Sequence, residues 1–563
     1  MPENIACRLH HSALRFPEKP AVVICRGPEG AGGFTSESHS FADLERDSDS
    51  HAFGLLDAGV RRGEKALVML KPSFAFFSCF FALLKIGAVP VLVDPGMGIR
   101  RLLECVRRLA PEALIGVPAA HAARFFLFRS FPRPRTTITT GRRRLLADRT
   151  WDGLLMPGSG PFPVIRPYDG ELAAILFTTG STGPAKGVEY DHAVLGRQIE
   201  ILSRTFAITP EDRDLASFPG FSLFSIALGM TAVVPDIDPT RPGQAHPRNI
   251  LVPIQEFSCT FSFGSPALWS RVSAYAETKK IRLPSLRRVV MAGAPVPAAT
   301  HGRLLGGILP GNADSFTPYG ATEVMPVACF TGREALAGTA ILGQEGKGVC
   351  VGRPLPGVHA EIIRIDDGPI AEWDDSLLAN PGEIGEIAIQ ANHASRHYHN
   401  LPDADMLAKI TDGDQFWHRM GDLGYRDDQE RLWLCGRKSH RVRTRKGDMF
   451  TLRCEAVFNR HPAVVRSALI GLPEKDGFAR PAIIIEPNRR LGRSERSRLA
   501  AELFRIGRNS PVSAAIETLF FHPAFPTDIR HNAKIGREAL AAWAGRHIRR
   551  AYFANESGRE VRQ

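Results

Sequence analysis

The sequence predicts an α/β protein with a large amino-terminal part and a smaller carboxyl-terminal part. Short apolar runs alternate with longer amphipathic stretches over most of the 563 residues, which favours largely parallel sheets covered by helices. After about residue 350, apolar runs are separated only by polar turns, which predicts a smaller β-rich section. A last α/β portion begins after the strongly charged segment 436–446.

The expected strands are short, and Gly, Pro or Asp residues bound them. In the amino-terminal part they span residues 65–70, 89–94, 172–179 and 287–293, and in the β-rich section 360–365 and 382–391. Residues 74–84 predict a buried helix. Lys71 and Lys85 flank this stretch, which is shorter than the ~18 apolar residues that a membrane span needs. We therefore expect no transmembrane segment.

The segment 436–446 predicts a domain boundary because it is short, charged and joins two compact regions. We place the division between 1–439 and 440–563. The starting residues MPENIACRLHH lack the apolar core of a signal peptide. Nine Cys residues are scattered singly without a CxxC pair, which argues against a zinc ribbon or a disulfide scaffold. Free thiols in a reducing cytoplasm are the favoured interpretation.

The composition is that of a folded chain, with 44% hydrophobic and 23% charged residues. The net charge is +12, and the positive charge is densest at 129–144 and 436–446. Such patches attract nucleic acid, acidic lipid or phosphorylated ligands. No nucleic-acid motif accompanies them, so nucleic acid is not an expected partner. We interpret 129–144 as a solvated face, whereas 436–446 lies beside a motif that favours a nucleotide role.

A glycine-rich loop directly follows the expected strand at 172–179. Its residues TTGSTGPAKG combine glycines that allow tight backbone turns with hydroxyl groups and one lysine. Such a loop after a buried strand indicates a phosphate-binding site. It is not a Walker A loop, because Ala185 and Gly187 stand where Gly and Ser or Thr would be needed. A flexible surface turn is the less favoured alternative.

This loop resembles the signature loop of the adenylate-forming superfamily, which includes acyl-CoA synthetases, luciferases and peptide-synthetase adenylation domains. Further segments resemble the family's motifs in the family's order: LLKIGAVPVLVDP (83–95), MAGAPVP (291–297), YGATE (319–323), VGRPLPG (351–357), PGEIGEI (381–387), HRMGDLGYRD (418–427), LWLCGRK (432–438) and HNAKIGRE (531–538). The resemblance covers almost the whole chain. It implies an acyl-CoA synthetase-like fold with a mobile carboxyl-terminal α+β domain.

The resemblance also implies the chemistry, which is attack of a carboxylate on the α-phosphorus of ATP to give an acyl-adenylate and pyrophosphate. It assigns Mg²⁺ to Glu323 and Thr178, since a hard cation prefers oxygen ligands. Lys534 would neutralise the carboxylate and the charge that develops on the α-phosphate. The other implied nucleotide contacts are Thr179, Gly180, Ser181, Thr182, Gly183, Lys186, Gly293, Ala294, Pro295, Tyr319, Gly320, Thr322, Asp422 and Arg437.

Within this set, Tyr319 would stack on adenine and Asp422 would bind the ribose hydroxyls. Three positions depart from the family pattern. His440 stands where the family's hinge usually has Asp, so the hinge assignment at this position is an expectation only. Glu430 stands where a turn usually has Gly, and Lys534 is preceded by Ala533 where relatives often have Gly.

Three histidines at 393, 397 and 399 offer a metal-like spacing. The segment YHNLPDADMLAKI, which begins at Tyr398 and contains His399, resembles the family's YxNxPEAT loop, which is not a metal site. We therefore favour a surface loop over metal binding.

Beyond the superfamily, VVPDIDPTRP, FGSPALW, SFTPYGATE and FPTDIRHNAKIGRE resemble the olefin-pathway β-lactone synthetases. This subgroup adenylates a 2-alkyl-3-hydroxy fatty acid, whose own hydroxyl then closes a β-lactone ring. The resemblance implies such a substrate, and as pathway partners a thiolase-like enzyme, a reductase and a β-lactone decarboxylase. Candidates for a ring-closing base are His192, Ser222, Asp236 and Asp238, although a loop-holding role is favoured for both aspartates. The region 218–228 predicts either an alkyl-chain wall or a core segment.

Two alternatives stay open. One is a long-chain fatty acyl-CoA or acyl-AMP synthetase, in which the activated acyl group passes to another acceptor or is retained. The other is a non-catalytic scaffold with the same fold, which the presence of Glu323, Asp422 and Lys534 disfavours.

Overall fold

The computed structural model describes residues 2–27, 34–93, 97–127, 131–144, 146–178, 185–527 and 535–554. The chain divides into two compact units. The first unit comprises Met1–Gly293, Arg303–Val327 and Ala391–Asp405, and the second comprises Ala294–Gly302, Ala328–Gln390 and Met406–Gln563. Neither unit begins or ends at residues 439/440. The domain boundary predicted there stays a prediction.

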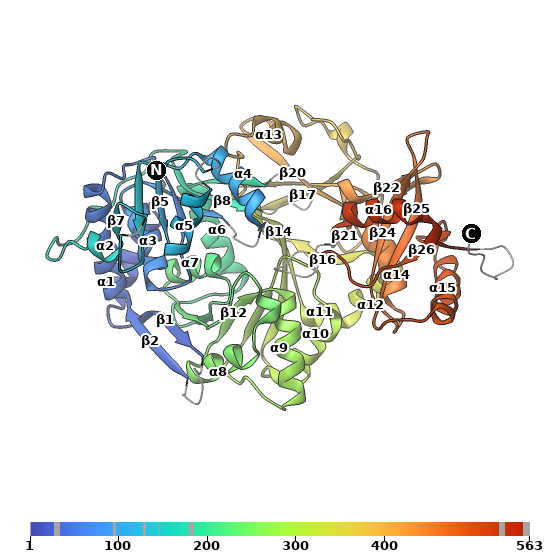
Figure 1. Cartoon of the computed structure of the whole chain (residues 1–563), viewed down its shortest axis with the longest axis horizontal. Coiled ribbons are helices and arrows are strands. Elements are labelled where there is room, and N and C mark those ends of the chain that lie inside the picture. The colour runs from blue at the N-terminus through green and yellow to red at the C-terminus, as the bar shows by residue number, and fades with distance from the viewer. Residues whose placement is uncertain are drawn as a thin grey trace. The chain divides into compact units, whose positions relative to one another are not determined.

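The first unit contains a seven-stranded sheet in the order β7-β6-β5-β3-β4-β8-β9 (Figure 1). All neighbouring strands are parallel except the antiparallel pair β8 and β9. The strands are β3 (Lys65–Met69), β4 (Val89–Val93), β5 (Ala113–Gly116), β6 (Thr136–Thr139), β7 (Arg149–Thr150), β8 (Leu172–Thr178) and β9 (Lys186–Asp191). The helices of this region are α1 (Ala6–Arg15), α2 (Phe41–Asp57), α3 (Phe74–Lys85), α4 (Ile99–Leu109), α5 (Pro118–Phe126) and α6 (His192–Thr205).

A second run of strands in the first unit has the order β14-β13-β12-β10-β11-β1-β2. Described neighbours are parallel until the final antiparallel pair β1 and β2. Its strands are β1 (Pro20–Arg26), β2 (Thr35–Ser40), β10 (Arg213–Leu215), β11 (Thr231–Val234), β12 (Phe261–Gly264), β13 (Arg288–Met291) and β14 (Asp314–Ala321). Its helices are α7 (Pro219–Ala227), α8 (Arg248–Glu256), α9 (Pro266–Thr278) and α10 (Ala298–Arg303), the last of which spans both units.

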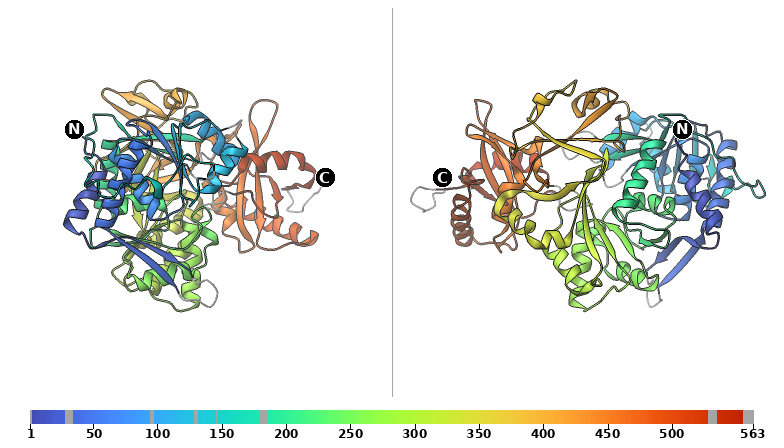
Figure 2. Two further views of the ribbon diagram at one scale, coloured as in Figure 1. Left: turned by 60° about the vertical axis from the view of Figure 1, so that its left-hand side comes forward. Right: turned by 180° about the vertical axis from the view of Figure 1, so that it is seen from behind.

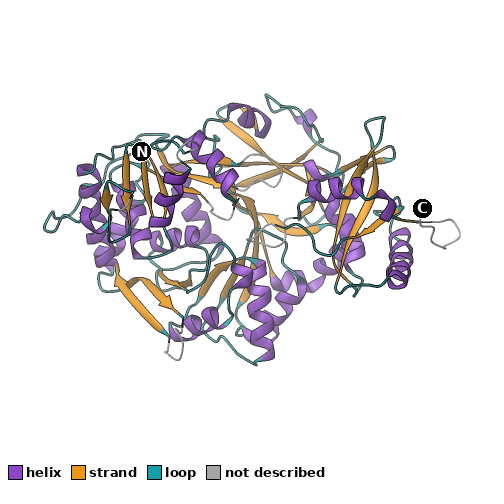
Figure 3. Cartoon of the chain, viewed as in Figure 1, coloured by secondary structure: helices purple, strands orange, loops and turns teal. Residues whose placement is uncertain are grey.

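The predicted α/β class is confirmed for this part of the chain. The apolar runs at 65–70, 89–94, 172–179 and 287–293 form β3, β4, β8 and β13. The predicted helix at 74–84 is α3, whose residues from Phe76 to Lys85 are all buried. Figure 3 shows helices packed beside the strands throughout this region. The nine cysteines all lie among the described residues and are free thiols.

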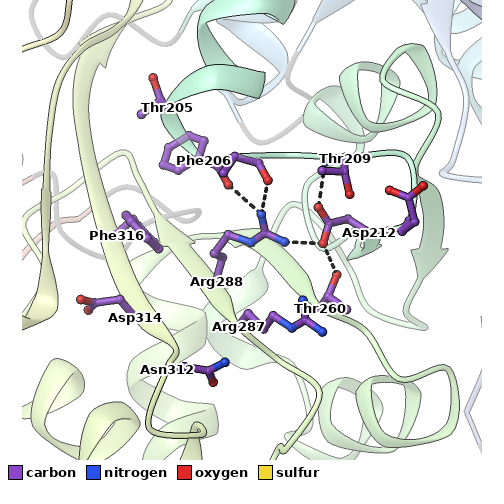
Figure 4. A pocket seen from close by; sticks show the side chains of 12 residues that line it. Thr205, Phe206, Thr209, Asp212, Thr260, Arg287, Arg288, Asn312, Asp314 and Phe316 are labelled. Atoms are coloured by element: carbon purple, nitrogen blue, oxygen red, sulfur yellow. Dashed lines mark hydrogen bonds and ion pairs between the residues drawn. The ribbon is translucent and has the colours of Figure 1, made fainter.

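An ion pair lies at the amino-terminal edge of the second strand run (Figure 4). Arg288, whose guanidinium pairs with Asp212, also donates to the carbonyls of Phe206 at 2.7 Å and Ala207 at 2.6 Å. Asp212 accepts from the Thr260 hydroxyl at 2.7 Å. Burial lowers the pKa of Arg288. A cavity of about 460 Å³ lies beside this network. In open parallel sheets, ligands bind at the opposite, carboxyl edge. We therefore interpret this network as a structural contact that holds neighbouring segments together.

The β-rich section of the second unit has the strand order β17-β18-β20-β21-β16, with β19 added beside β20. It confirms the β-rich section predicted after about residue 350, since its described strand pairs are antiparallel. The strands are β16 (Val349–Pro354), β17 (Val358–Ile363), β18 (Gly385–Ala391), β19 (Lys409–Asp412), β20 (Gln415–Arg426) and β21 (Leu432–Arg437), and β15 (Val324–Thr331) pairs with β16 through Ala328 and Cys329. Short helices flank them at α11 (Gly332–Glu334), α12 (Ala340–Leu342) and α13 (Pro402–Ala408).

The carboxyl-terminal portion is built on a four-stranded sheet in the order β24-β25-β26-β27 (Figures 1 and 2). Its strands are β24 (Val464–Pro473), β25 (Ala479–Pro487), β26 (Thr518–Phe521) and β27 (Tyr552–Phe553), and a separate pair is formed by β22 (Val442–Thr444) and β23 (Gly447–Met449). Its helices are α14 (Thr451–Asn459), α15 (Arg493–Arg508) and α16 (Arg537–Arg546). Two hydrophobic clusters, one beginning at Val442 and one at Ala468, draw their buried members from this portion alone.

The turn between β20 and β21 contains the departure noted at Glu430. Glu430 has a φ of 60°, in the left-handed region that favours glycine. Asp427 organises the turn, because its carboxylate accepts from the amide nitrogens of Gln429 and Arg431 at 3.0 and 2.9 Å. The side chain of Glu430 lies 3.2 Å from Arg426, which gives it a partner that glycine would lack.

We expect the variant Glu430→Gly to raise the free energy of unfolding by about 0.5–1 kcal/mol, because relief of the left-handed strain exceeds the loss of an exposed ion pair and the added freedom of the unfolded chain. Glu430→Val is the matched control, and we expect it to lower stability by ~1 kcal/mol, since a β-branched side chain fits this region worst. Denaturant titration measures both. An order other than Gly, Glu, Val from most to least stable would contradict the assignment of strain.

Candidate active site

Glu323 forms the centre of a polar cluster in the first unit. It lies between β14 and β15, and its Oε1 accepts a hydrogen bond from the Tyr398 hydroxyl at 2.6 Å. The Nζ atom of Lys186 lies 4.5 Å from the centre of the Tyr398 ring, a cation–π contact. The ring of Tyr398 therefore joins the predicted magnesium ligand to the lysine of the phosphate loop, which are 137 residues apart in the sequence.

The strand β9 positions this cluster. His399 donates its backbone N–H to the Gly187 carbonyl at 2.7 Å, and Glu189 donates its N–H to the His397 carbonyl at 3.1 Å. Residues 397–399 therefore run antiparallel beside β9, with Val188 opposite Tyr398. On the same strand, the Tyr190 hydroxyl donates to the carbonyl of Thr322, the residue before Glu323. One strand thus aligns both the loop that carries Tyr398 and the turn that carries Glu323.

The three histidines of this loop have different partners. His393 Nε2 donates to the Pro326 carbonyl at 3.0 Å. The Nδ1 atom of His399 lies 2.7 Å from Glu189 Oε1, and the Nδ1 atom of His397 lies 3.2 Å from Asp405 Oδ2. The surface-loop interpretation fits His397, whose side chain is 65% exposed. It is wrong for His393 and His399, which are buried, because the loop packs along β9. Burial lowers the pKa of His393.

The predicted adenine-binding residues lie on neighbouring elements. Tyr319 is buried on β14, and Gly320 follows it. A side chain at Gly320 would place its Cβ 2.7 Å from the Val324 carbonyl oxygen, so only glycine fits there. Gly293 follows β13 with a φ of 94°. Ala294 and Pro295 belong to the second unit, and their predicted place beside Tyr319 stays a prediction.

The predicted ribose site lies in the second unit, where Asp422 and Arg437 are directly opposite each other on β20 and β21. Arg437 Nε lies 3.1 Å from Asp422 Oδ1, and its Nη1 donates to the Met420 carbonyl at 3.0 Å. Asp422 is 5% exposed. The antiparallel register therefore brings together two residues that the sequence assigned to separate motifs.

His440 ends the short helix Lys438–His440, just after β21. Its Nε2 lies 3.3 Å from Glu538 on α16, and its side chain is 7% exposed. Burial and the neighbouring Arg537 lower the pKa of His440 to about 4, so the imidazole is neutral at pH 7. The structure describes one conformation of this segment, and the hinge role of His440 stays a prediction.

Several predicted site residues lie outside the described residues. They are Thr179, Gly180, Ser181, Thr182, Gly183 and Lys534. Thr178 is the last residue of β8 and the register partner of Lys186 on β9. Next to the other gap, Ile535 bridges Thr527, and Arg537 pairs with the buried Glu455 at 2.7 Å.

The candidates for a ring-closing base have different surroundings. Ser222 is fully buried in α7 and donates back to the Phe218 carbonyl at 3.2 Å, which indicates a core role. Asp236 accepts from the Gly27 N–H at 2.8 Å, and Asp238 accepts from the Thr240 N–H at 2.9 Å, so both hold loops as favoured. His192 is buried, and burial lowers its pKa to about 4. A pKa this low makes the neutral imidazole a weak proton acceptor at pH 7, which disfavours His192 as the ring-closing base.

The core alternative is supported for the region 218–228. Phe221 on α7 is 1% exposed and stacks on Phe263 with ring centroids 4.3 Å apart.

Sequence reasoning missed Tyr398 as a site residue. The YxNxPEAT-like pattern marked its loop, but only the pairing of that loop with β9 directs the hydroxyl to Glu323.

Among the described residues, no three His, Cys, Asp or Glu side chains are grouped to hold a metal ion. Glu323 offers one carboxylate, and Mg²⁺ is commonly held by one or two carboxylates together with phosphate oxygens and water. Within the described ranges, none of the helices combines the length and the apolar character needed to cross a bilayer.

Comparison with known proteins defines the class. The family model described as AMP-binding enzyme matches residues 9–399, well over half of the chain. The chain belongs to the AMP-binding enzyme family, and it is an AMP-forming ligase.

Within that family, the chain is 42% identical over 556 residues to an olefin beta-lactone synthetase of Stenotrophomonas maltophilia, covering 97% of this chain and 99% of the relative. It is 41% identical to the olefin beta-lactone synthetase of Xanthomonas campestris pv. campestris, covering 96% and 97%. These two relatives confirm the subgroup resemblance.

Solved structures confirm the fold. An amide bond synthetase from Marinactinospora thermotolerans has a TM-score of 0.77 at 21% identity, covering 96% of this chain and 99% of that chain. The O-succinylbenzoate coenzyme A synthetase of Bacillus subtilis, solved with ATP and magnesium ion, has a TM-score of 0.72 at 18% identity, covering 96% and 99%.

Proposed function

We propose that this protein adenylates a long-chain 2-alkyl-3-hydroxy fatty acid with ATP and then closes the product to a β-lactone. The observation that carries the adenylation step is the cluster of Glu323, Tyr398 and Lys186. The full-length similarity to two olefin beta-lactone synthetases supports the second step.

In the first step, a carboxylate oxygen of the acid attacks the α-phosphorus, and the bond to the β-phosphate oxygen breaks to release pyrophosphate. Lys186 and the loop 178–187 hold the departing phosphates. Glu323 would hold Mg²⁺ through its carboxylate, with Thr178 as a second protein ligand, and the bound ion would neutralise phosphate charge. Tyr398 fixes the rotamer of Glu323 through its 2.6 Å hydrogen bond.

The remaining residues position the nucleotide and the acid. Asp422 accepts hydrogen bonds from the ribose hydroxyls, while Arg437, paired with it at 3.1 Å, orients the carboxylate. Tyr319 stacks on adenine. Lys534 stabilises the negative charge on the α-phosphate, which is an electrostatic role.

In the second step, the substrate's own 3-hydroxyl oxygen attacks the acyl carbon. The bond from that carbon to the AMP oxygen breaks, AMP leaves, and the hydroxyl proton passes to a base or to water. Tethering the nucleophile to the electrophile gives a high effective molarity, so no second substrate is needed.

We also propose that residues 440–563 act as a lid that turns at His440. Two hydrophobic clusters, one beginning at Val442 and one at Ala468, support a lid with a core of its own, because their buried members all come from this portion. The lid carries Lys534. The finer expectations of a cytoplasmic location and of thiolase-like, reductase and β-lactone decarboxylase partners rest on the family resemblance.

The alternative function is a long-chain acyl-CoA synthetase. Transfer of the acyl group to CoA is supported by more distant relatives, such as the 4-chlorobenzoate–CoA ligase of an Arthrobacter species at 25% identity over 470 residues. That function differs in the acceptor of the activated acyl group.

A product assay by NMR separates the two functions. The protein is incubated with ATP, Mg²⁺ and a 2-alkyl-3-hydroxy fatty acid, with and without CoA. We expect a β-lactone and AMP in the absence of CoA. A thioester that forms only with CoA would establish the alternative and overturn ring closure.

A further inference from the structure

The helix α5 presents two exposed aromatic rings at its carboxyl end. Phe125 is 56% exposed and Phe126 is 78% exposed, with their ring centroids 5.7 Å apart. Leu146, on the loop between β6 and β7, is 37% exposed. A soluble surface seldom exposes neighbouring large apolar side chains without a function for them.

Contacts join this helix to the loop that carries Leu146. Arg124 on α5 donates from Nη2 to the Leu146 carbonyl at 2.7 Å. Near the start of α5, Gly141 lies so close to Pro118 that a side chain at 141 would place its Cβ 2.7 Å from the proline ring. The loop therefore lies along the helix that carries the aromatic pair.

Basic residues outnumber acidic ones in the segments that carry these side chains. Residues 124–152 contain eight Arg but only two Asp. One of them, Asp148, turns its carboxylate to Thr137, accepting from the N–H at 2.9 Å and from the hydroxyl at 2.7 Å. We define the aromatic–basic patch as the exposed residues Phe125, Phe126, Arg133, Arg142, Arg143, Arg144, Leu146 and Arg149.

We propose that the aromatic–basic patch docks the protein on the surface of an anionic lipid bilayer. Guanidinium groups are attracted to acidic headgroups, and aromatic rings are stable at the boundary between headgroups and acyl chains. The two features lie on segments that contact each other through Arg124 and the Leu146 carbonyl, and charge attraction to a soluble acidic protein would not require the aromatic pair. This proposal gives the segment 129–144 a role beyond that of a solvated face, and the solvated-face interpretation stays a prediction. The inference rests on the surface itself and does not depend on the proposed function.

The test is sedimentation of the full-length protein with vesicles of phosphatidylcholine alone or mixed equally with phosphatidylglycerol. We expect binding to the anionic vesicles only. The triple variant Arg142→Gln, Arg143→Gln, Arg144→Gln is expected to bind about 100-fold more weakly, given the attraction of each basic residue near an anionic surface. The double variant Phe125→Ser, Phe126→Ser is expected to bind ~10-fold more weakly, since it removes the inserted apolar area.

The matched control removes the same charge from α15, where Arg493, Arg496 and Arg498 are exposed. Changing these three to Gln is expected to leave vesicle binding within about twofold of the wild type. Circular dichroism checks that every variant is folded. The proposal is overturned if the wild type does not sediment with anionic vesicles. It is also overturned if both arginine triples weaken binding equally, or if the phenylalanine double variant binds like the wild type. None of these readouts involves catalysis.

Discussion

Replacing Glu323 with Gln is expected to lower the rate of acyl-adenylate formation by about 10²–10³-fold, because the variant loses the anionic oxygen that we propose binds Mg²⁺ beside the phosphates. Gln is nearly the same size as Glu and still accepts the Tyr398 hydrogen bond through its carbonyl oxygen. The variant therefore keeps a hydrogen bond in place of the 2.6 Å contact with Tyr398 but loses the negative charge. ATP–pyrophosphate exchange measures the step directly, and it does not depend on which acceptor follows.

Tyr398→Phe is the companion variant, since it keeps the ring beneath Lys186 and removes only the hydroxyl that holds Glu323. We expect a smaller loss of ~10-fold, together with a higher requirement for Mg²⁺, because removing a group that orients a metal ligand commonly costs affinity. A dependence on Mg²⁺ concentration that is unchanged in both variants would show that Glu323 does not hold the metal.

Replacing Lys534 with Ala is expected to reduce adenylation by about 10²–10³-fold, because the positive charge proposed to stabilise the α-phosphate is lost. Lys534 lies outside the described residues, so the prediction rests on its motif. The next described residue, Ile535, bridges Thr527, and Arg537 pairs with the buried Glu455 at 2.7 Å.

The control is Lys475→Ala, which removes the same side chain from an exposed position in the turn between β24 and β25. We expect its exchange activity to match the wild type. Thermal unfolding should be unchanged in both variants. Exchange that persists undiminished in Lys534→Ala would remove the lysine from the proposed mechanism, while equal losses in both lysine variants would point to a general charge effect.

Most of the secondary structure could be predicted from the sequence. The apolar runs became β3, β4, β8 and β13, since a buried parallel strand requires a continuous apolar stretch whatever its neighbours are. The buried helix α3 followed from its length and its flanking lysines. The left-handed position of Glu430 is also local, because the motif marked that turn as one that usually contains glycine.

The candidate site was predictable only in part. Ordered motifs located Glu323, Asp422 and Arg437, but they did not reveal that Asp422 and Arg437 pair across β20 and β21. They also missed Tyr398 and wrongly placed His393 and His399 on a surface. Each of these features arises from segments far apart in the sequence.

The sequence by itself therefore determined the strand and helix pattern, the glycine-dependent turns and the family. Periodicity, backbone preference and motif spacing are local properties that survive without tertiary contacts. Only the tertiary structure decided that Tyr398 contacts Glu323, that the helix of Phe125 and Phe126 contacts an arginine-rich loop, and that Arg288 pairs with Asp212 at the edge of a sheet. These outcomes depend on strand register and on which segments pack together, because a shift of one residue in register moves every side chain to the other face of the sheet.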